Sequence, residues 1–353
     1  MSATLQHPAP AVDGHEAPAA AAAPRPKRGW RADLAPYTVP STPRAVAGLL
    51  TSVVPYLALS TAMALLLDVS YWLTLLVAVP TAGFAVRTYI VFHDCAHGSF
   101  LPSKRANHVV GVVTALIVFT PFAAWRHHHA VHHATAGDLD RRGEGDVATL
   151  TVDEYRALPW HRRLLYRFGR SPAVMLTLGP VWELLIQTRI WKRTDRTRIK
   201  RSVIGTNVAL AVIVAVLCWI MGPVQFLLVQ VPITWLAGAA GIWLFYVQHQ
   251  YEDAYWENSG TWDYAEAALQ GSSFLKLPRV LQFFSGNIGL HHVHHLSAKV
   301  PNYRLQAAHD NTTILREVPV LTAWDGVKAL RLKLWDPRQG RLVTWRQAAA
   351  VPR

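Results

Sequence analysis

The sequence predicts an all-α integral membrane protein with four transmembrane helices in two hairpins, additional interfacial helices, and a cytoplasmic cap rich in histidine. Three observations support this: long uncharged apolar runs, basic residues concentrated in one large loop, and three short histidine clusters. Of the 353 residues, 51% are hydrophobic and only 16% are charged. This composition argues against a disordered chain, a collagen or a disulfide scaffold.

Four apolar runs are long enough to cross a bilayer. The first two, residues 46–67 and 69–92, are separated by Asp68 alone, so they predict a tight hairpin. A helix of 22 residues such as 46–67 rises about 33 Å, which matches the thickness of a bilayer core. A second hairpin is predicted from 203–221 and 224–247, with its turn at the Met-Gly-Pro sequence 221–223.

The remaining segments are less apolar. Residues 106–125 are uncharged, but a simple span there would put the first two histidine clusters on opposite sides, so we expect a re-entrant or interfacial segment. Residues 172–191 contain Glu183 and Arg189 and predict an interfacial helix. The predicted domains are therefore a disordered tail (1–45), a membrane domain (46–310) and a C-terminal cytoplasmic segment (311–353).

Charge distribution predicts the orientation. The chain has 35 Lys and Arg against 22 Asp and Glu, a net charge of +13, and the 141–201 loop alone holds 14 of the basic residues. The hairpin turns carry only Asp68. The positive-inside rule then places both termini, the large loop and the histidines in the cytoplasm of a multi-pass protein, in a bacterial inner membrane or its equivalent. Because topology explains the basic residues and no nucleic-acid motif accompanies them, nucleic acid is not an expected partner.

Histidine is the most informative residue type. Eleven of the 17 histidines fall in the segments 93–97, 127–133 and 291–295. Within them, spacings of three and four residues place imidazoles on shared helix faces. The residues that share faces are His93 and His97, then His129, His132 and His133, then His291, His294 and His295.

Eight imidazoles in three clusters are more than one metal ion requires, so the pattern predicts a cap that binds two metals. His249 ends the last apolar run. A lone histidine there is more often structural than a ligand, but its depth matches that of the three clusters. The other histidines are not expected to be ligands. They are His127, His128 and His292, which lie off the shared faces, the isolated His108, His161 and His309, and His7 and His15 in the tail.

Five motifs carry a family resemblance that extends from about residue 45 to 310. The sequences HDCAHGSF, WRHHHAVHH and NIGLHHVHH resemble the three histidine boxes of the membrane-bound fatty acid desaturase superfamily. The sequences GDLDRRGEGDV and YVQHQYEDAYW resemble its acyl-lipid (Δ12/ω-type) branch.

This resemblance implies an oxidoreductase that uses O₂ to place a cis double bond in a lipid-linked acyl chain, within unsaturated fatty acid biosynthesis. It also implies a non-haem di-iron centre, with two Fe ions. Carried over residue by residue, its catalytic ligands are His93, His97, His129, His132, His133, His249, His291, His294 and His295. Here His249 matches the additional histidine that precedes the third box.

The reaction itself demands a redox metal. An unactivated CH₂–CH₂ unit offers no polar handle to an acid or base, and zinc, although its ligand preferences fit, has no redox chemistry. The sequence lacks flavin, nicotinamide and haem-binding HPGG motifs, so we expect a separate electron donor, ferredoxin or cytochrome b5.

Two other functions remain open from sequence. A hydroxylase or related oxygenase of the same superfamily would use the same boxes. A membrane metal-binding or transport protein is a remote alternative, because it should carry polar residues along its spans, which are nearly free of them.

Several polar residues near the boxes could support the ligands. Asp94, Asp138, Asp146 and Glu252 could each orient an imidazole or be ordinary surface carboxylates. Asn287, four residues before His291, could reach a metal-bound water if the segment is helical, or could cap a helix.

Overall fold

The computed structural model describes residues 29–143 and 145–351. Four long helices dominate it: α2 (Thr42–Leu66), α3 (Tyr71–His97), α9 (Thr197–Met221) and α10 (Pro223–His249). All four are long and apolar enough to cross a membrane, which confirms the four spans expected from sequence as helices. Their ends differ from the predicted ones: α3 and α9 in particular extend further at the ends that face the histidines.

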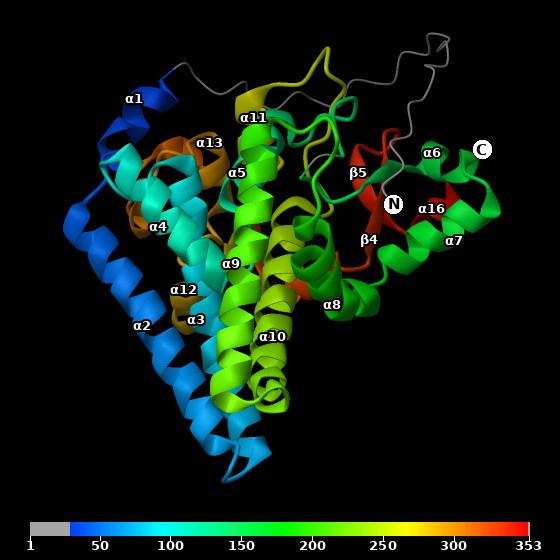
Figure 1. Cartoon of the computed structure of the whole chain (residues 1–353). Coiled ribbons are helices and arrows are strands. Elements are labelled where there is room, and N and C mark those ends of the chain that lie inside the picture. The colour runs from blue at the N-terminus through cyan, green and yellow to red at the C-terminus, as the bar shows by residue number, and fades with distance from the viewer. Residues whose placement is uncertain (1–28, 144, 352–353) are drawn as a thin grey trace.

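The long helices form two antiparallel pairs that taper to a common tip (Figure 1). Residues 67–70 join α2 to α3, and the turn between α9 and α10 is a single glycine, Gly222, with φ +89°. In the core, Met63 of α2 and Ala78 of α3 pack with Ile233 of α10. The tip of the first pair is tied by Thr74 Oγ1, which donates to the Met63 carbonyl at 3.3 Å.

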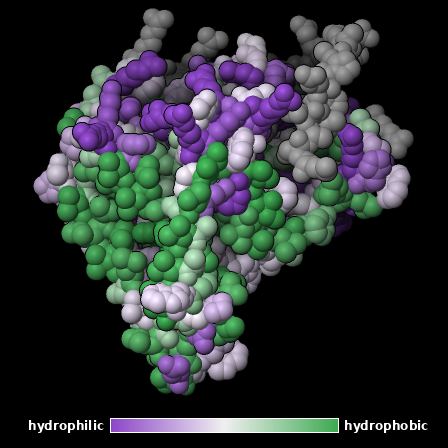
Figure 2. All heavy atoms as spheres, in the orientation of Figure 1, coloured by the Kyte–Doolittle hydropathy of each residue, from purple (hydrophilic) through white to green (hydrophobic). Residues whose placement is uncertain are grey.

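The outer surface of these helices is apolar. Trp219 is 86% exposed and Trp72 is 78% exposed, values that would be unfavourable in water but suit contact with lipid. Figure 2 shows a broad hydrophobic surface over the long helices, with hydrophilic residues gathered above it.

The predicted segment 106–125 is broken in two. Helices α4 (Lys104–Ile117) and α5 (Phe122–Thr135) meet at a bend of 102°. Phe119 within the break has φ +53°, a left-handed conformation that a helix cannot continue through. The bend agrees with the expectation that this segment is not a straight span. It turns α5, with the second histidine cluster, back toward the end of α3.

The segment 172–191 is helical but irregular. It consists of α8 (Pro172–Val181), a π-helical stretch (Trp182–Ile186) and a 3₁₀ turn (Gln187–Arg189). It packs closely on α10, since a Cβ added to Gly238 would lie 2.7 Å from Pro180 Cβ.

The prediction of an all-α fold is wrong in one respect, because two small β-sheets are present. Strands β1 (Leu150–Thr151), β4 (Leu332–Asp336) and β5 (Arg341–Thr344) form one sheet in the order β1-β4-β5, with β1 parallel and β5 antiparallel to β4. Strands β2 (Phe274–Lys276) and β3 (Val320–Thr322) pair in parallel. Apolar residues such as Leu334 and Val343 are fully buried there with Tyr155, so the C-terminal segment is part of the folded protein.

Short helices complete the end of the molecule that carries the histidines. They are α1 (Trp30–Leu34), α6 (Val152–Ala157), α7 (Trp160–Gly169), α11 (Tyr264–Gln270), α12 (Arg279–Phe284), α13 (His291–Leu296), α14 (Leu305–Asn311), α15 (Ala323–Ala329) and α16 (Trp345–Ala350). Helix α1 lies within the predicted disordered tail, yet Leu34 is buried and Trp30 stacks on Tyr264 with ring centroids 6.4 Å apart. The rest of that tail, residues 1–28 with His7 and His15, lies outside the described residues.

The bend between α4 and α5 provides a test of the packing that positions the second histidine cluster. A Cβ on Gly111 would meet the Phe122 ring at 2.1 Å, and Phe122 is itself buried. We expect Gly111→Ala to lower the free energy of unfolding by about 1–3 kcal/mol through overpacking.

The matched control is Gly205→Ala in α9, where nothing lies within 4 Å of the added Cβ, so stability should hold or rise slightly. Thermal melting in detergent measures both, and equal melting temperatures for the two variants would contradict the close packing at Gly111.

Candidate metal centre

The first cluster occupies the last turn of α3. His93 and His97 are one turn apart and therefore point the same way. The helix ends at Gly98, whose φ of +65° is a left-handed conformation that glycine adopts at little cost. The Ser99 N–H then donates to the Asp94 carbonyl at 3.0 Å, which closes the helix end and fixes His97 at the edge of the centre.

The second cluster lies on α5, held from behind by α9. The Ala123 N–H donates to Ser202 Oγ at 3.0 Å, and Ala124 packs against Ile199 and Val203. This fixes the helix axis, so that the imidazoles at positions 129, 132 and 133 face α3 and α13.

The third cluster forms α13, and His249 is the last residue of α10. The chain before α13 runs against β2, where the Leu275 N–H donates to the Gly289 carbonyl at 2.8 Å. A Cβ on Gly289 would lie 2.4 Å from the Leu275 carbonyl oxygen, so this approach requires glycine. Strand β2 therefore sets where α13 begins.

All nine histidines expected from the motifs come together, in two groups. The nitrogen atoms within each group lie within 4.8 Å of one another. The first group is His93, His97, His129, His133 and His294; the second is His132, His249, His291 and His295. The groups adjoin, since the His133 and His295 rings stack with centroids 4.2 Å apart.

The spacing of the nitrogens suits metal coordination. In the first group, His129 Nε2 lies 3.1 Å from His93 Nε2 and 3.1 Å from His133 Nε2. In the second, His249 Nε2 lies 3.2 Å from His132 Nε2 and 2.9 Å from His291 Nε2. Two nitrogens bound at about 2.1 Å and at right angles to one ion would be about 3.0 Å apart.

Hydrogen bonding alone does not account for this arrangement. Each imidazole nitrogen has one in-plane position, filled by a proton or a lone pair, so a nitrogen with close neighbours on two sides cannot form a normal bond to both. His97 Nε2 and His295 Nε2 are buried without any partner. Lone pairs that converge on a common point are what a cation needs, so the residues present fit two metal ions.

In three of these histidines, Nδ1 contacts an oxygen atom of another residue. His93 Nδ1 lies 3.0 Å from Asp94 Oδ1, and His132 Nδ1 is hydrogen-bonded to Asp146. His249 Nδ1 donates to the Gly271 carbonyl at 3.2 Å. Such contacts place the proton on Nδ1 and leave the Nε2 lone pair for a metal.

Burial favours the neutral form of the three clustered histidines of α13. In α13, burial lowers the pKa of His291, His294 and His295 well below the ordinary value of 6.5, and neighbouring imidazoles lower it further. Neutral imidazole is the form that binds metal.

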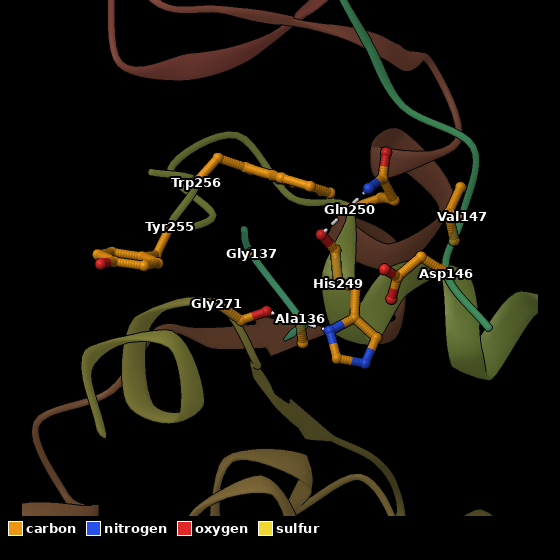
Figure 3. Close-up of a pocket in the computed structure, with 9 residues that line it drawn as sticks. All are labelled: Ala136, Gly137, Asp146, Val147, His249, Gln250, Tyr255, Trp256 and Gly271. Carbon is orange, nitrogen blue, oxygen red and sulfur yellow. Dashed lines mark hydrogen bonds between the residues drawn. The ribbon is translucent and has the colours of Figure 1, made fainter. Parts of the chain in front are cut away.

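Figure 3 shows a small cavity behind His249. The His249 ring is held on one side by Gly271, and Asp146 lies nearby, with Tyr255 and Trp256 on the far wall. Its size is roughly that of one water molecule. The cavity is thus too small for an acyl chain. It could hold one water molecule beside His249 and Asp146.

Not every sequence expectation about supporting residues holds. Asp138 binds Arg141 and Ser259, and Glu252 pairs with Arg341 at 3.0 Å, so neither carboxylate orients a ligand. Asn287 is not helical: its φ is +61° and its Nδ2 donates to the Asn302 carbonyl at 3.2 Å. It therefore shapes the turn before α13 and does not face the metal centre through a helix.

Within the described residues, the histidines that were not expected to be ligands lie outside the two groups. His292 is buried, and its Nε2 lies 3.1 Å from His309 Nδ1. His309 was expected to be isolated, and this contact shows that it is not. His108 packs edge-on against Phe122, and His127 and His161 are exposed.

Two features were missed by sequence reasoning. Trp125 stacks on His129 with centroids 4.2 Å apart, and Phe245 lies 5.2 Å from His249. The spacing in the sequence could have predicted both contacts. Trp125 lies four residues before His129, and Phe245 lies four residues before His249, so each pair shares a helix face. These aromatic rings cover one histidine in each of the two groups.

Comparison with known proteins decides the family. The family model for fatty acid desaturases matches residues 69–319, most of the chain. The chain is 44% identical to a fatty acid desaturase of Bacillus subtilis over 90% of its length and 91% of the relative's. The chain belongs to the fatty acid desaturase family.

Two more distant relatives in the desaturase family come from Synechocystis. An sn-1 oleoyl-lipid 12-desaturase is 28% identical over 63% of both chains. An sn-1 acyl-lipid omega-3 desaturase (ferredoxin) is 27% identical over 62% of both chains.

His249 is the candidate ligand whose role is best tested by substitution. In this desaturase-family protein, His249→Ala removes the nitrogen that lies between His132 and His291 in the second group. We expect metal content to fall to about half and activity to be lost, while the protein still folds and inserts. His161→Ala, on the exposed face of α7, should match the wild type, usually within about 0.5 kcal/mol in stability.

Elemental analysis and product yield, measured on the same purified samples, check this prediction. Wild-type metal content and yield in His249→Ala would remove this residue from the centre.

Asp146 supplies a second test, because it is hydrogen-bonded to His132 but belongs to neither group of candidate ligands. Asp146→Asn keeps the size of the side chain and weakens its hold on the His132 Nδ1 proton, so metal affinity should fall about 10–100-fold. Glu252→Gln is the matched control, since Glu252 contacts Arg341 at the surface and should not alter affinity. Competition with a chelator measures both variants; equal affinities would show that Asp146 does not orient the ligand.

Proposed function

We propose that the protein is an acyl-lipid desaturase that introduces a cis double bond into a lipid-linked acyl chain with O₂, at two iron ions held by the nine histidines. The observation that carries this is the convergence of nine histidine side chains in two adjoining groups. Relatives whose names specify acyl-lipid substrates support the substrate class.

The protein's contribution to the chemistry is positioning and exclusion. When bound, two irons supply the oxidation of an unactivated C–H bond by O₂, which no side chain can perform. The imidazole nitrogens would hold the ions, while Asp94 and Asp146 contact Nδ1 of His93 and His132 and orient these rings. Trp125 and Phe245 cover part of the imidazoles and keep water from the reacting region.

The proposed reaction, and not the donor set, favours iron over zinc. Imidazole binds zinc and iron alike, but only iron has the redox states that the reaction needs. No carboxylate belongs to either group of ligands in the described residues, so negative charge reaches the centre only through residues such as Asp94 and Asp146.

Electrons are expected from a separate carrier, ferredoxin or cytochrome b5. The chain carries a net charge of +13, which favours association with an acidic protein. One Synechocystis relative has ferredoxin in its name, which supports a donor of this kind.

The proposed location is a membrane crossed by the four long helices, with the histidines and both termini on the cytoplasmic side. The apolar outer surface of the helices and the 14 basic residues of the 141–201 loop support this orientation. A bacterial inner membrane or its equivalent would provide the setting.

Lipid profiling tests the reaction directly. Expression in a host together with a reduced donor and O₂ should yield acyl chains lighter by two hydrogens, detected by mass spectrometry after transesterification. Two variants give the controls: His161→Ala should form product, and His97→Ala, which lacks a candidate ligand, should not. Acyl chains heavier by one oxygen would instead identify a hydroxylase, and no change in lipids would count against both reactions.

The metal is tested on purified protein. Chelation should abolish product formation, and Fe²⁺ but not Zn²⁺ should restore it, with about two irons bound per chain. Restoration by Zn²⁺ would contradict the redox role.

A further inference from the structure

Arg87 is a charged residue within the apolar part of α3, and the proposed reaction does not use it. It lies six residues before His93, so its Cα is about 9 Å further along the helix from the metal centre. A guanidinium at such a place is costly unless an anion, carbonyl groups or lipid headgroups surround it, and residues of this kind usually mark a site.

The protein itself gives Arg87 few partners. Its Nη1 donates to the Phe283 carbonyl, and its guanidinium carbon lies 4.1 Å from the centre of the Phe283 ring. Its Nε is buried without a partner. None of the ion pairs among residues 29–143 and 145–351 includes Arg87. Its positive charge is therefore not neutralised by any carboxylate in that part of the chain.

Arg87 lines a cavity between α2 and α3. Besides Arg87, its lining residues are Gly48, Ser52, Ile90, Val91, Gly286 and Asn302. Glycines keep part of this space open: at Gly286, φ is +53° and a Cβ would lie 2.8 Å from Ile90 Cγ2. The cavity is roughly the size of one water molecule, so it can admit a single oxygen atom of a larger group that stays outside.

The cavity is linked to the metal centre by one residue. Asn302 lines the cavity, and its N–H and its Nδ2 donate to Asp94 Oδ2 at 2.7 and 2.8 Å. The other oxygen of Asp94 holds His93 Nδ1 at 3.0 Å. A group bound at Arg87 is thus separated from a predicted ligand by two side chains.

The surface around Arg87 is apolar on one side and basic on the other. Val280 and Phe283 of α12 and Leu50 of α2 are exposed, as expected for residues that face lipid. Arg44 precedes Gly48 by one turn on α2, and therefore lies on the face that lines the cavity.

Arg304 adds a second basic group on that side. Its Nε is also buried without a partner. Arg304 directly follows Tyr303 in the chain. The Tyr303 hydroxyl accepts a hydrogen bond from the Ser41 N–H at 2.9 Å, three residues before Arg44. In a membrane, the boundary between apolar and basic surface is where the phosphates of phospholipids lie.

We propose that Arg87 binds a phosphate oxygen of a membrane phospholipid at the cavity between α2 and α3, with Arg44 on the cytoplasmic side of the same phosphate. Guanidinium and phosphate match in geometry and charge, and one non-bridging oxygen fits the cavity while the rest of the headgroup stays at the surface. This site goes beyond the proposed function and does not depend on it, because a phospholipid would bind there whether or not its acyl chain reacts.

Native mass spectrometry of the metal-loaded protein in detergent tests the site. The probes are phosphatidylglycerol, diacylglycerol with the same acyl chains, and inorganic phosphate. We expect the wild type to retain one phosphatidylglycerol in preference to diacylglycerol, and Arg87→Gln to lose this retention by about tenfold. Arg87→Lys should be intermediate, because lysine keeps the charge without the planar fork.

The matched control is Arg189→Gln. Arg189 donates to Asn207 Oδ1 at 3.0 Å, to the Phe119 carbonyl and to Thr188 Oγ1, so its guanidinium is already bonded within the protein. Its replacement should leave phosphatidylglycerol retention unchanged even if stability falls. Metal content and melting temperature show whether each variant is folded; if Arg87→Gln does not fold, Arg87→Lys provides the comparison.

Three results would overturn the proposal. The first is equal retention of phosphatidylglycerol by the wild type and the folded Arg87 variants. The second is equal retention of diacylglycerol and phosphatidylglycerol, and the third is displacement of the lipid by millimolar inorganic phosphate. The last would show a site for free phosphate. Failure of the proposed reaction would be seen in lipid profiling alone, with phospholipid retention intact, so the two failures are distinguishable.

Discussion

The structure depends on the need to hold nine imidazoles within contact of one another at one end of a bundle of long apolar helices. Nitrogens about 3 Å apart, such as those of His129 and His133, are tolerable only if each ring is neutral and turned to a fixed angle. Protonation of even a few of these rings would place like charges side by side in a buried region. Burial and mutual proximity, which lower the pKa of the histidines in α13, therefore also keep the centre in the form that binds cations.

The fold satisfies this need by bringing helix ends together. Helices α3 and α10 each carry histidines in their last turn, so the ends of two apolar helices deliver His97 and His249 to the same place. The bend of 102° before α5 returns the second cluster to that place, and strand β2 fixes the start of α13. A different local feature positions each of these elements at the centre. A shift in any of the elements would separate the imidazole nitrogens.

The C-terminal segment contributes to this positioning. Lys333 on β4 donates to the Arg170 carbonyl at 2.5 Å, and Arg170 donates to Gln250 Oε1 at 2.8 Å, directly after His249. Burial, and then the charge of Arg170, lower the pKa of Lys333 to about 7. Cations are favourable at the C-terminal end of a helix, which is where both groups lie relative to α10. The segment predicted from sequence only as a C-terminal cytoplasmic segment thus supports the end of the helix that carries His249.

The sequence by itself determined the elements with strong local signals. The four long helices follow from uninterrupted apolar runs, and the candidate ligands follow from histidine spacing and family motifs, because both are properties of neighbouring residues. The sequence did not reveal the small sheets, since strands as short as Leu150–Thr151 have almost no periodicity and form only when Leu334 and its neighbours pack beside them.

Only the tertiary structure decided how the histidines are divided. His132 and His133 are adjacent in sequence but belong to different groups, because successive side chains on a helix point about 100° apart and meet different neighbours. The same holds for the carboxylates: Asp94 and Asp146 reach histidines, whereas Asp138 reaches Arg141. Which group a side chain faces depends on contacts between segments far apart in the chain, and no local pattern records those contacts.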